Sequence, residues 1–426
     1  MQTQEELEKN FKVKIFRIFI YLKLSSFINA FFLDKSSIKG DIYKKFKHIT
    51  KKNFSIATSQ LRVGFYLVLN YLKFTNPNKK EIIVSSYNLA EMVNICKNLK
   101  LRIIYPKLND NLSFSLNDLK KKINNKTLAV VATNIFNDQN DLVKIKRMCK
   151  NKKIPLIEDN AIYFGNFYKK NKIKVYAGSF GDYALHSFNI MKNISAMYGG
   201  LVSTNDKKFI QYANQEINSF KNFPYLKYLN QCIIYFILKL LSNNFIYKLF
   251  FFPLSKLAHK KDLTFYLKIL YPSLKFKKTS IPKNYFTHIN SLSLNLIWLQ
   301  LNDMKYFDYL QKIRSKNNLL YYKELSRKQI KELKLIKINS PSFQNFNDFP
   351  IIVKRKKELL KYLFNNGIET KFIQYVDCQK IFNEKYKNSS QTYEDKVLCL
   401  PNHLKINEKY IKFVTSLIQK FYEKKI

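Results

Sequence analysis

Glycine, proline, tryptophan and cysteine are all scarce in this sequence of 426 residues, with 8, 10, 1 and 5 copies respectively. The cysteine count is odd, the spacings are wide and no C-x-x-C pair occurs, which argues against a disulfide framework and against a zinc site. Unpaired thiols fit a reducing compartment, so we expect a cytoplasmic protein without a bound metal. The five are Cys96, Cys149, Cys232, Cys378 and Cys399.

Acidic residues are also few: Asp and Glu total 30 against 75 Lys and Arg, which gives a formal net charge of +45. Such a charge suits nucleic acid, an anionic membrane surface or a polyanionic substrate as a partner. However, the lysines are spread along the whole chain, and an AT-biased genome also encodes a chain rich in Lys, Asn, Ile, Phe and Tyr. We favour this second explanation and do not expect nucleic acid as a partner.

No apolar run is both long and free of charge. The stretch 11–33 is interrupted by lysines and an arginine and lacks a small-residue cleavage site, so it does not resemble a secretory signal. In the stretch 224–257 the longest charge-free run is 228–238, which is too short to span a bilayer. Its regular lysines suit either a helix lying in a membrane interface or a buried helix pair whose lysines reach water. We favour the buried pair and leave peripheral membrane contact open.

Hydrophobic residues make up 46% of the chain, enough for a large domain and a smaller one. From about residue 54, short apolar runs alternate with helical patterns, which predicts an α/β domain with a mostly parallel sheet flanked by helices. Beyond about residue 290 the pattern is mostly helical with one strand, which predicts a smaller C-terminal α+β domain. The expected units are an amphipathic helical extension (1–53), a large domain (54–290, with 224–257 as a helical insertion) and a small domain (291–426).

Individual elements can be placed from the same patterns. The predicted strands cover 81–86, 102–106, 128–133, 154–159, 183–188, 199–204 and 349–353. The predicted helices cover 89–99, 115–123, 141–153 and 354–367, with Ser115 as an N-cap and Gly367 as a C-cap. In parallel sheets ligands bind at the carboxyl ends of the strands, and Asp159 lies at one such end.

Five of the eight glycines lie between residues 165 and 200. Glycine serves where the backbone needs a positive φ or a close approach, so we expect turns around a site here. Asp159, Ser187 and Lys192 fall in or beside this window. A lysine beside apolar neighbours can be desolvated, which lowers its pKa and frees the amine to attack a carbonyl. A hydroxyl can hold a phosphate, and a buried carboxylate can hold the proton of a pyridine nitrogen. Each residue alone also fits an ordinary structural role, such as a solvated lysine or a helix-capping aspartate.

The run IEDNAIYFGNFYKKNKIKVYAGSFGDYALHSFNIMKNISAMYGGLVSTND (157–206) resembles the DegT/DnrJ/StrS family of pyridoxal-phosphate (PLP) sugar aminotransferases. The shared pattern runs E-D-x-A, S-F-G-D, S-F-x-x-x-K-N and G-G-x-x-x-T-N-D. FSIATSQLRVGFYLVL (54–69) resembles the family's phosphate loop and following helix, and NIFNDQNDL (134–142) resembles a further family segment. In all, the resemblance covers about residues 54–220 and 285–426.

The resemblance implies PLP-transferase fold type I, pyridoxal 5'-phosphate as cofactor and a homodimer. Lys192 resembles the catalytic lysine that carries the cofactor and relays a proton. Asp159 resembles the partner of the ring nitrogen, and Ser187 resembles a phosphate ligand. Arg62 can supply charge in the phosphate loop, and Asn134 stands where the family usually has a histidine.

The sequence departs from the family pattern at several secondary cofactor contacts. The Ser-Gly-Thr cluster of the phosphate loop is replaced by Ser59, Gln60 and Leu61. The other departures are Leu89 for the aromatic that stacks on the ring, Ile162 for the Gln or His at the ring oxygen, and Tyr198 for the acid before the glycine pair.

The resemblance implies transfer of an amino group from glutamate to a nucleotide-linked keto-deoxysugar, for a surface polysaccharide such as O-antigen lipopolysaccharide or capsule. One alternative is a relative without transamination, either a sugar dehydratase or a degenerate member that binds a sugar nucleotide or PLP. The family's dehydratases have histidine in place of the lysine, so Lys192 argues against that branch. Another alternative is a basic protein that uses the fold to bind a membrane surface or nucleic acid.

Overall fold

The computed structural model describes residues 14–136, 139–170, 173–261, 280–336, 347–371, 375–382 and 392–423. Residues 1–13 of the expected extension, residues 137–138 of the family-like segment 134–142 and residues 262–279 of the expected large domain lie outside this part. The boundaries expected for the three units therefore stay predictions, and the elements themselves are as follows.

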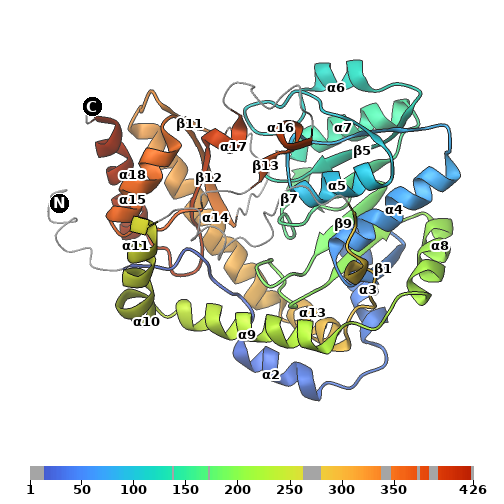
Figure 1. Ribbon diagram of the computed structural model, residues 1–426, viewed down its shortest axis with the longest axis horizontal. Coiled ribbons are helices and arrows are strands. Elements are labelled where there is room, and N and C mark those ends of the chain that lie inside the picture. Colours follow the sequence, from blue (N-terminus) through green and yellow to red (C-terminus); the bar gives the residue numbers. More distant parts are fainter. Residues whose placement is uncertain are drawn as a thin grey trace.

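A seven-stranded sheet forms the centre of the larger part of the molecule (Figure 1). Its strands are β1 (Phe54–Thr58), β2 (Glu81–Ile83), β4 (Arg102–Ile104), β5 (Thr127–Thr133), β6 (Leu156–Asp159), β9 (Tyr183–Ser187) and β10 (Gly200–Thr204). The order is β1-β10-β9-β6-β5-β2-β4; every pair from β9 to β4 is parallel, and β10 is antiparallel to both neighbours. The predicted α/β fold with a mostly parallel sheet is confirmed.

Helices flank this sheet, which explains why β5 is buried along its whole length and reads as a continuous apolar run. They are α4 (Leu61–Thr75), α5 (Ala90–Asn98), α6 (Leu116–Lys122), α7 (Gln139–Asn151) and α8 (Lys207–Asn218). Ser115 precedes α6 as predicted, but its side chain makes no capping hydrogen bond. A short hairpin is formed by β7 (Phe167–Lys170) and β8 (Ile173–Tyr176), and a second two-stranded pair joins β3 (Tyr87–Asn88) to β13 (Val376–Asp377) from the C-terminal part of the chain.

The C-terminal part has an antiparallel sheet of β11 (Leu333–Leu335), β12 (Asp348–Val353) and β14 (Val397–Pro401). It packs with α14 (Met304–Arg327), α15 (Lys356–Asn365) and α18 (Glu408–Glu423) around its own apolar core, as an α+β unit should. Gly367 follows α15 with φ +85°, which is the conformation expected of a glycine that ends a helix. The remaining elements are η3 (Lys283–Tyr285), α13 (Ser291–Asn302), α16 (Cys378–Phe382) and α17 (Tyr393–Lys396).

The N-terminal extension is helical only in part. α2 (Leu24–Phe32) and α3 (Ile38–Thr50) are helices, whereas residues 14–23 form none. This stretch is held instead by distant residues, since Arg17 pairs with Glu369 at 3.3 Å and the carbonyl of Phe16 lies 3.0 Å from His403 Nε2. Tertiary contacts therefore override its local apolar pattern.

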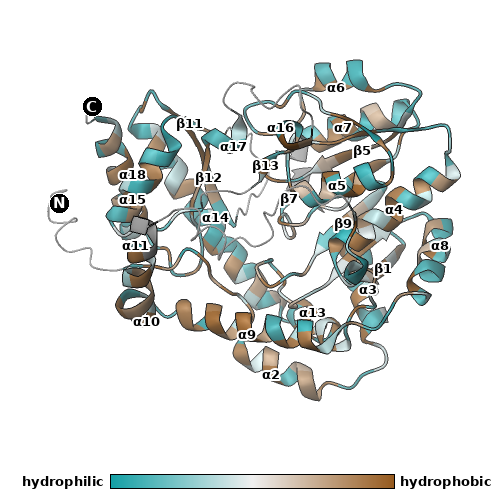
Figure 2. Ribbon diagram, in the orientation of Figure 1, coloured by the Kyte–Doolittle hydropathy of each residue, from teal (hydrophilic) through white to brown (hydrophobic). Residues whose placement is uncertain are grey.

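The predicted insertion is helical, with α9 (Tyr225–Leu241), α10 (Asn244–Ile246), η1 (Tyr247–Phe251) and α11 (Phe252–Lys261). Figure 2 shows apolar residues along most of α9, which runs beside α2. Lys239 is half-buried, and its Nζ donates to the carbonyls of Leu22 at 2.6 Å and Ile20 at 3.1 Å. Within the described residues, no single helix is long and apolar enough to cross a membrane; the bent pair 225–241 and 244–257 passes that test only jointly.

Candidate functional site

The candidate site lies where the parallel strands β5, β6 and β9 end together. Asp159 is the last residue of β6 and Ser187 the last of β9, and Lys192 follows in the next turn. Asp159 is paired in register with Leu185 of the neighbouring strand. The carboxylate, the hydroxyl and the amine thus come from one edge of the sheet, as the sequence predicted.

Asp159 is a buried carboxylate with a single hydrogen bond among the described residues. Its Oδ1 accepts from the backbone N–H of Ala161 at 3.0 Å. Burial raises its pKa to about 6, and both this hydrogen bond and the charge of Lys192 act in the opposite direction. A buried carboxylate that is still ionised near neutral pH is suited to hold a positively charged ring N–H.

Lys192 is half-buried in a turn where its backbone N–H donates to the carbonyl of Asn189 at 2.9 Å. Burial lowers its pKa to about 8, the nearby charges of Lys371 and Arg62 act in the same direction, and Asp159 opposes them. A lysine with such a pKa presents a substantial fraction of neutral amine near pH 7, which is what attack on a carbonyl requires.

The Lys192 turn is held in place by its neighbour Asn193. The Asn193 amide donates to the carbonyl of Phe164 at 2.6 Å, and its oxygen accepts from Arg314 Nη1 at 2.9 Å. Arg314 belongs to α14, is buried, and also bonds to Asn347. Asn193 could be noted from the sequence, because it follows Lys192 in the K-N pair of the motif. Arg314 could not be predicted, because it lies more than a hundred residues away on a helix of ordinary composition.

The glycine pair allows two distant segments to meet beside Ser187. Gly200 is paired with Ser187 in the sheet, and a Cβ at Gly200 would lie 2.4 Å from the backbone nitrogen of Leu61. Gly199 has φ +144°, which side chains rarely adopt, and it bridges to Gln60. Because of this close approach, the N-terminus of α4 lies beside the end of β9. Backbone N–H groups at a helix N-terminus favour an anion such as a phosphate.

Arg62 lies in the first turn of α4, but its guanidinium is already engaged. Nη1 donates to the hydroxyl of Tyr285 at 3.0 Å and pairs with Glu91 at 3.4 Å. The hydroxyl of Ser59 donates to the carbonyl of the same Tyr285 at 3.0 Å. Residues Ser59 and Arg62 of the predicted phosphate loop thus face Tyr285, and Arg62 acts on Lys192 through its charge.

Asn134, at the end of β5, is directed to a different set of partners. Its amide nitrogen donates to Asn160 Oδ1 at 2.7 Å and to Glu158 Oε1 at 3.2 Å. Neither partner belongs to the group of Asp159, Ser187 and Lys192. Within the described residues its side chain makes no hydrogen bond to Asp159, Ser187 or Lys192, and its role as a cofactor ligand stays a prediction.

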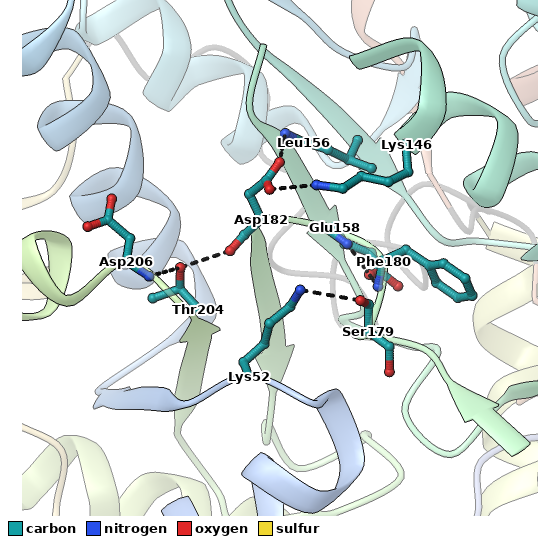
Figure 3. A network of polar contacts seen from close by, with 10 residues as sticks. Lys52, Lys146, Leu156, Glu158, Ser179, Phe180, Asp182, Thr204 and Asp206 are labelled. Atoms are coloured by element: carbon teal, nitrogen blue, oxygen red, sulfur yellow. Dashed lines mark hydrogen bonds and ion pairs between the residues drawn. The ribbon is translucent and has the colours of Figure 1, made fainter. Parts of the chain in front are cut away.

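Glu158 anchors the turn that leads into β9 (Figure 3). It is fully buried, and it accepts hydrogen bonds from the backbone N–H groups of Gly178 at 2.6 Å, Phe180 at 3.0 Å and Gly181 at 2.9 Å. Burial raises its pKa, while the three N–H groups oppose that shift. The carboxylate thus satisfies these three donors and fixes the S-F-G-D turn.

Asp182 closes the same turn on the other side. Its carboxylate accepts from the N–H of Leu156 at 2.8 Å and pairs with Lys146 at 2.5 Å, and its carbonyl accepts from Thr204 at 2.8 Å (Figure 3). β6, β9 and β10 are thereby tied together below the site. The E-D and S-F-G-D motifs consequently have different roles, since Asp159 faces the site whereas Glu158 and Asp182 support its framework.

Two side chains from the C-terminal part reach the site and were not predicted. Lys371 lies close enough to lower the pKa of Lys192, and it pairs with Asp348 at 3.3 Å. Tyr375 is buried near Asp159, and its ring packs edge-on against Tyr87 with centroids 5.7 Å apart. The C-terminal part therefore supplies one wall of the site. The departing residues Leu89 and Ile162 are half-buried in the adjoining apolar cluster.

A mostly parallel sheet whose strand ends carry this aspartate and lysine is the fold of the PLP transferases of fold type I. The structure superposes on that of Helicobacter pylori PseC, an aminotransferase of pseudoaminic acid biosynthesis, with TM-score 0.69, 14% identity and coverage of 96% of this chain and 99% of the other. It also superposes on Escherichia coli GDP-4-keto-6-deoxy-D-mannose-3-dehydratase with bound hydrated PLP, with TM-score 0.67, 17% identity and coverage of 95% and 99%.

Residues 38–224 match the model of the DegT/DnrJ/EryC1/StrS aminotransferase family. GDP-perosamine synthase of Escherichia coli O157:H7 is 31% identical over 176 residues, which are 40% of this chain and 47% of that protein. The chain thus matches about half the length of this relative, and the family match over residues 38–224 includes the motif region that builds the site.

Proposed function

We propose that this protein is a PLP-dependent aminotransferase that acts on a nucleotide-linked keto sugar. The observation that carries the proposal is that Lys192, whose pKa is lowered to about 8, lies within electrostatic range of the buried carboxylate of Asp159 at the strand ends. The match of residues 38–224 to the aminotransferase family and the PLP-bound neighbour of the same fold support it.

The residues present fit PLP. Lys192 supplies an amine to hold the cofactor, Asp159 a buried carboxylate for its ring nitrogen, and Ser187 with the N-terminus of α4 a place for its phosphate. When bound, PLP serves as an electron sink for proton removal beside the amino group. Lys192 is then the group placed to carry that proton, because no other described amine lies so close to Asp159 at the strand ends.

The finer parts of the proposal concern donor, acceptor and assembly. We propose glutamate as the amino donor and a nucleotide-linked keto-deoxysugar as the acceptor, for a cell-surface polysaccharide. The names of related proteins support a nucleotide-sugar substrate, since a GDP-perosamine synthase is similar in sequence and a TDP-sugar enzyme in fold. We also propose that the protein forms a homodimer and acts in the cytoplasm.

A second candidate is a family member that binds PLP or a sugar nucleotide without transamination. The contacts of Ser59 and Arg62 with Tyr285 favour it, because they occupy groups that the phosphate loop would otherwise offer. The two candidates differ in what an amino donor does to the bound cofactor.

The deciding experiment records the visible absorbance of the protein purified with PLP, before and after addition of L-glutamate. We expect a protein-bound PLP band that L-glutamate bleaches with formation of 2-oxoglutarate, and we expect neither in Lys192→Ala. Lys169→Ala is the control, because this residue belongs to the same motif region but lies on the hairpin β7–β8. A stable band that glutamate leaves unchanged would select the second candidate. No band at all would refute the first candidate and the PLP-binding form of the second.

A further inference from the structure

A broad apolar face is exposed along α2, α9, η1 and α11, and we refer to it as the α2–α11 face. Exposed fractions reach 83% for Phe32, 73% for Leu226, 49% for Ile233, 60% for Phe250 and 61% for Leu254. Isolated exposed apolar residues are normal, but a continuous row over several helices marks an interaction surface.

α9 is apolar on both of its sides, yet only one side is covered. Tyr228, Cys232 and Tyr235 pack inward, and the ring of Tyr235 stacks on Phe27 of α2 with centroids 4.8 Å apart. Leu229, Ile233 and the residues that continue their three- and four-residue spacing point outward. A helix that is hydrophobic all round is normally buried, whereas no part of the chain that the structure describes covers the outer side of α9.

The charges around this face have one sign. No Asp or Glu occurs between residues 217 and 261, whereas lysines recur. Lys248 and Lys256 are exposed at the α11 end of the face, and Lys14 lies near both. The Nζ of Lys14 is 3.8 Å from the ring centre of Phe252, a buried residue of α11, so Lys14 lies against the helix that carries Lys256 and the exposed Leu254. Apolar residues with a basic border complement an anionic lipid surface.

We propose that the α2–α11 face docks on the surface of an anionic lipid bilayer. α9 and the helices after it are bent by 81° relative to each other, and no single described helix is long enough to cross. The face therefore lies in the headgroup region, with its apolar side chains dipping into the acyl boundary and Lys14, Lys248 and Lys256 meeting lipid phosphates. This proposal stands apart from the proposed function.

A second copy of the chain is a poorer occupant of the same face. A symmetric contact through it would confront the lysines of this face with those of the second copy, with no acidic residue of 217–261 to offset them. Like charges across an interface are costly, whereas an anionic bilayer supplies the missing negative charge.

The layer beneath the face connects it to the candidate site. The inward side of α9 shares one apolar core with Phe188, Ile190 and Ile194 of the Lys192 turn. In a docked protein, one layer of helix would therefore separate this turn from the bilayer. The side chains that form the docking surface are not those that form the site.

The test is cosedimentation of the full chain with vesicles of phosphatidylcholine alone or mixed with phosphatidylglycerol. We expect binding to the mixed vesicles, weakened about tenfold or more in Leu229→Ser/Ile233→Ser/Leu254→Ser because three partly inserted apolar side chains are lost. Lys248→Gln/Lys256→Gln should reduce binding to the mixed vesicles. The matched control is Phe74→Ser/Leu319→Ser, which removes two exposed apolar side chains outside the face. Phe74 of α4 is 78% exposed and Leu319 of α14 is 64% exposed, and this variant should bind like the wild type.

Circular dichroism and the hydrodynamic mass of each variant without lipid complete the test. No binding to mixed vesicles by the wild type would overturn the proposal, as would equal loss in the control variant. If the triple variant changes the oligomeric state while vesicle binding stays the same, the face is covered by a second copy and the proposal is wrong.

Discussion

The lowered pKa of Lys192 yields a prediction in which two substitutions have opposite effects. The charge of Lys371 lowers this pKa and the charge of Asp159 raises it, while burial sets its level near 8. Lys371→Gln should therefore raise the pKa of Lys192, and Asp159→Asn should lower it. Both replacements keep nearly the same volume, so the change in charge is the main perturbation.

The size of the effect follows from the fraction of neutral amine. At pH 7 a pKa of about 8 leaves about 9% of the amine neutral, which is about 300-fold more than a lysine of pKa 10.5 would have. In Lys371→Gln the reactivity of Lys192 at pH 7 should fall, and its pH profile should move to higher pH. In Asp159→Asn the reactivity should rise and the profile should move to lower pH.

Competitive acetylation of the cofactor-free protein, read by mass spectrometry for the peptide that contains Lys192, measures this pKa directly. It is independent of PLP affinity, which both substitutions can also change. The exposed Lys354 serves as an internal reference with an unaltered environment. A wild-type profile centred near pH 10.5, or a shift of the same sign in both variants, would show that the electrostatic description of the site is wrong.

Three further predictions concern the framework of the site. Glu158→Ala should lower the free energy of unfolding by about 3 kcal/mol or more, measured by urea denaturation, because two buried N–H groups and the part-buried N–H of Phe180 lose their acceptor. An unchanged midpoint would contradict the role of the carboxylate. Gly200→Ala should lower the free energy of unfolding by about 2 kcal/mol in the same assay, since the added Cβ would overlap Leu61. Gly40→Ala, with open space around its Cβ, should be neutral or slightly stabilising. Equal effects of the two substitutions would refute the close approach of Gly200 to Leu61. The pKa of Asp159 is about 6 in the folded protein and ordinarily 3.8, so the folded state binds this proton more tightly than the unfolded state. The free energy of unfolding should therefore fall by up to about 3 kcal/mol as pH rises from about 4 to 6. If the same pH dependence persists in Asp159→Asn, another group causes it.

The sequence predicted the alternation of strands and helices well, because each buried strand is a short apolar run and each helix has its own period. Every predicted strand from 81–86 to 349–353 has a counterpart, although β2 and β4 stop at residues 83 and 104. The ends differ because pairing with neighbouring strands, which the local pattern does not contain, decides where a strand stops.

The sequence by itself determined the fold class and brought Asp159, Ser187 and Lys192 to one edge of the sheet, since residues at the ends of adjacent parallel strands must meet. Only the tertiary structure decided the rest. It directs Asn134 toward Glu158, sets Arg314 behind the Lys192 turn, brings Lys371 beside the amine and leaves the outer side of α9 exposed. These features arise from contacts between segments far apart in the chain, and the environment of a side chain depends on such packing, which periodicity and spacing do not record.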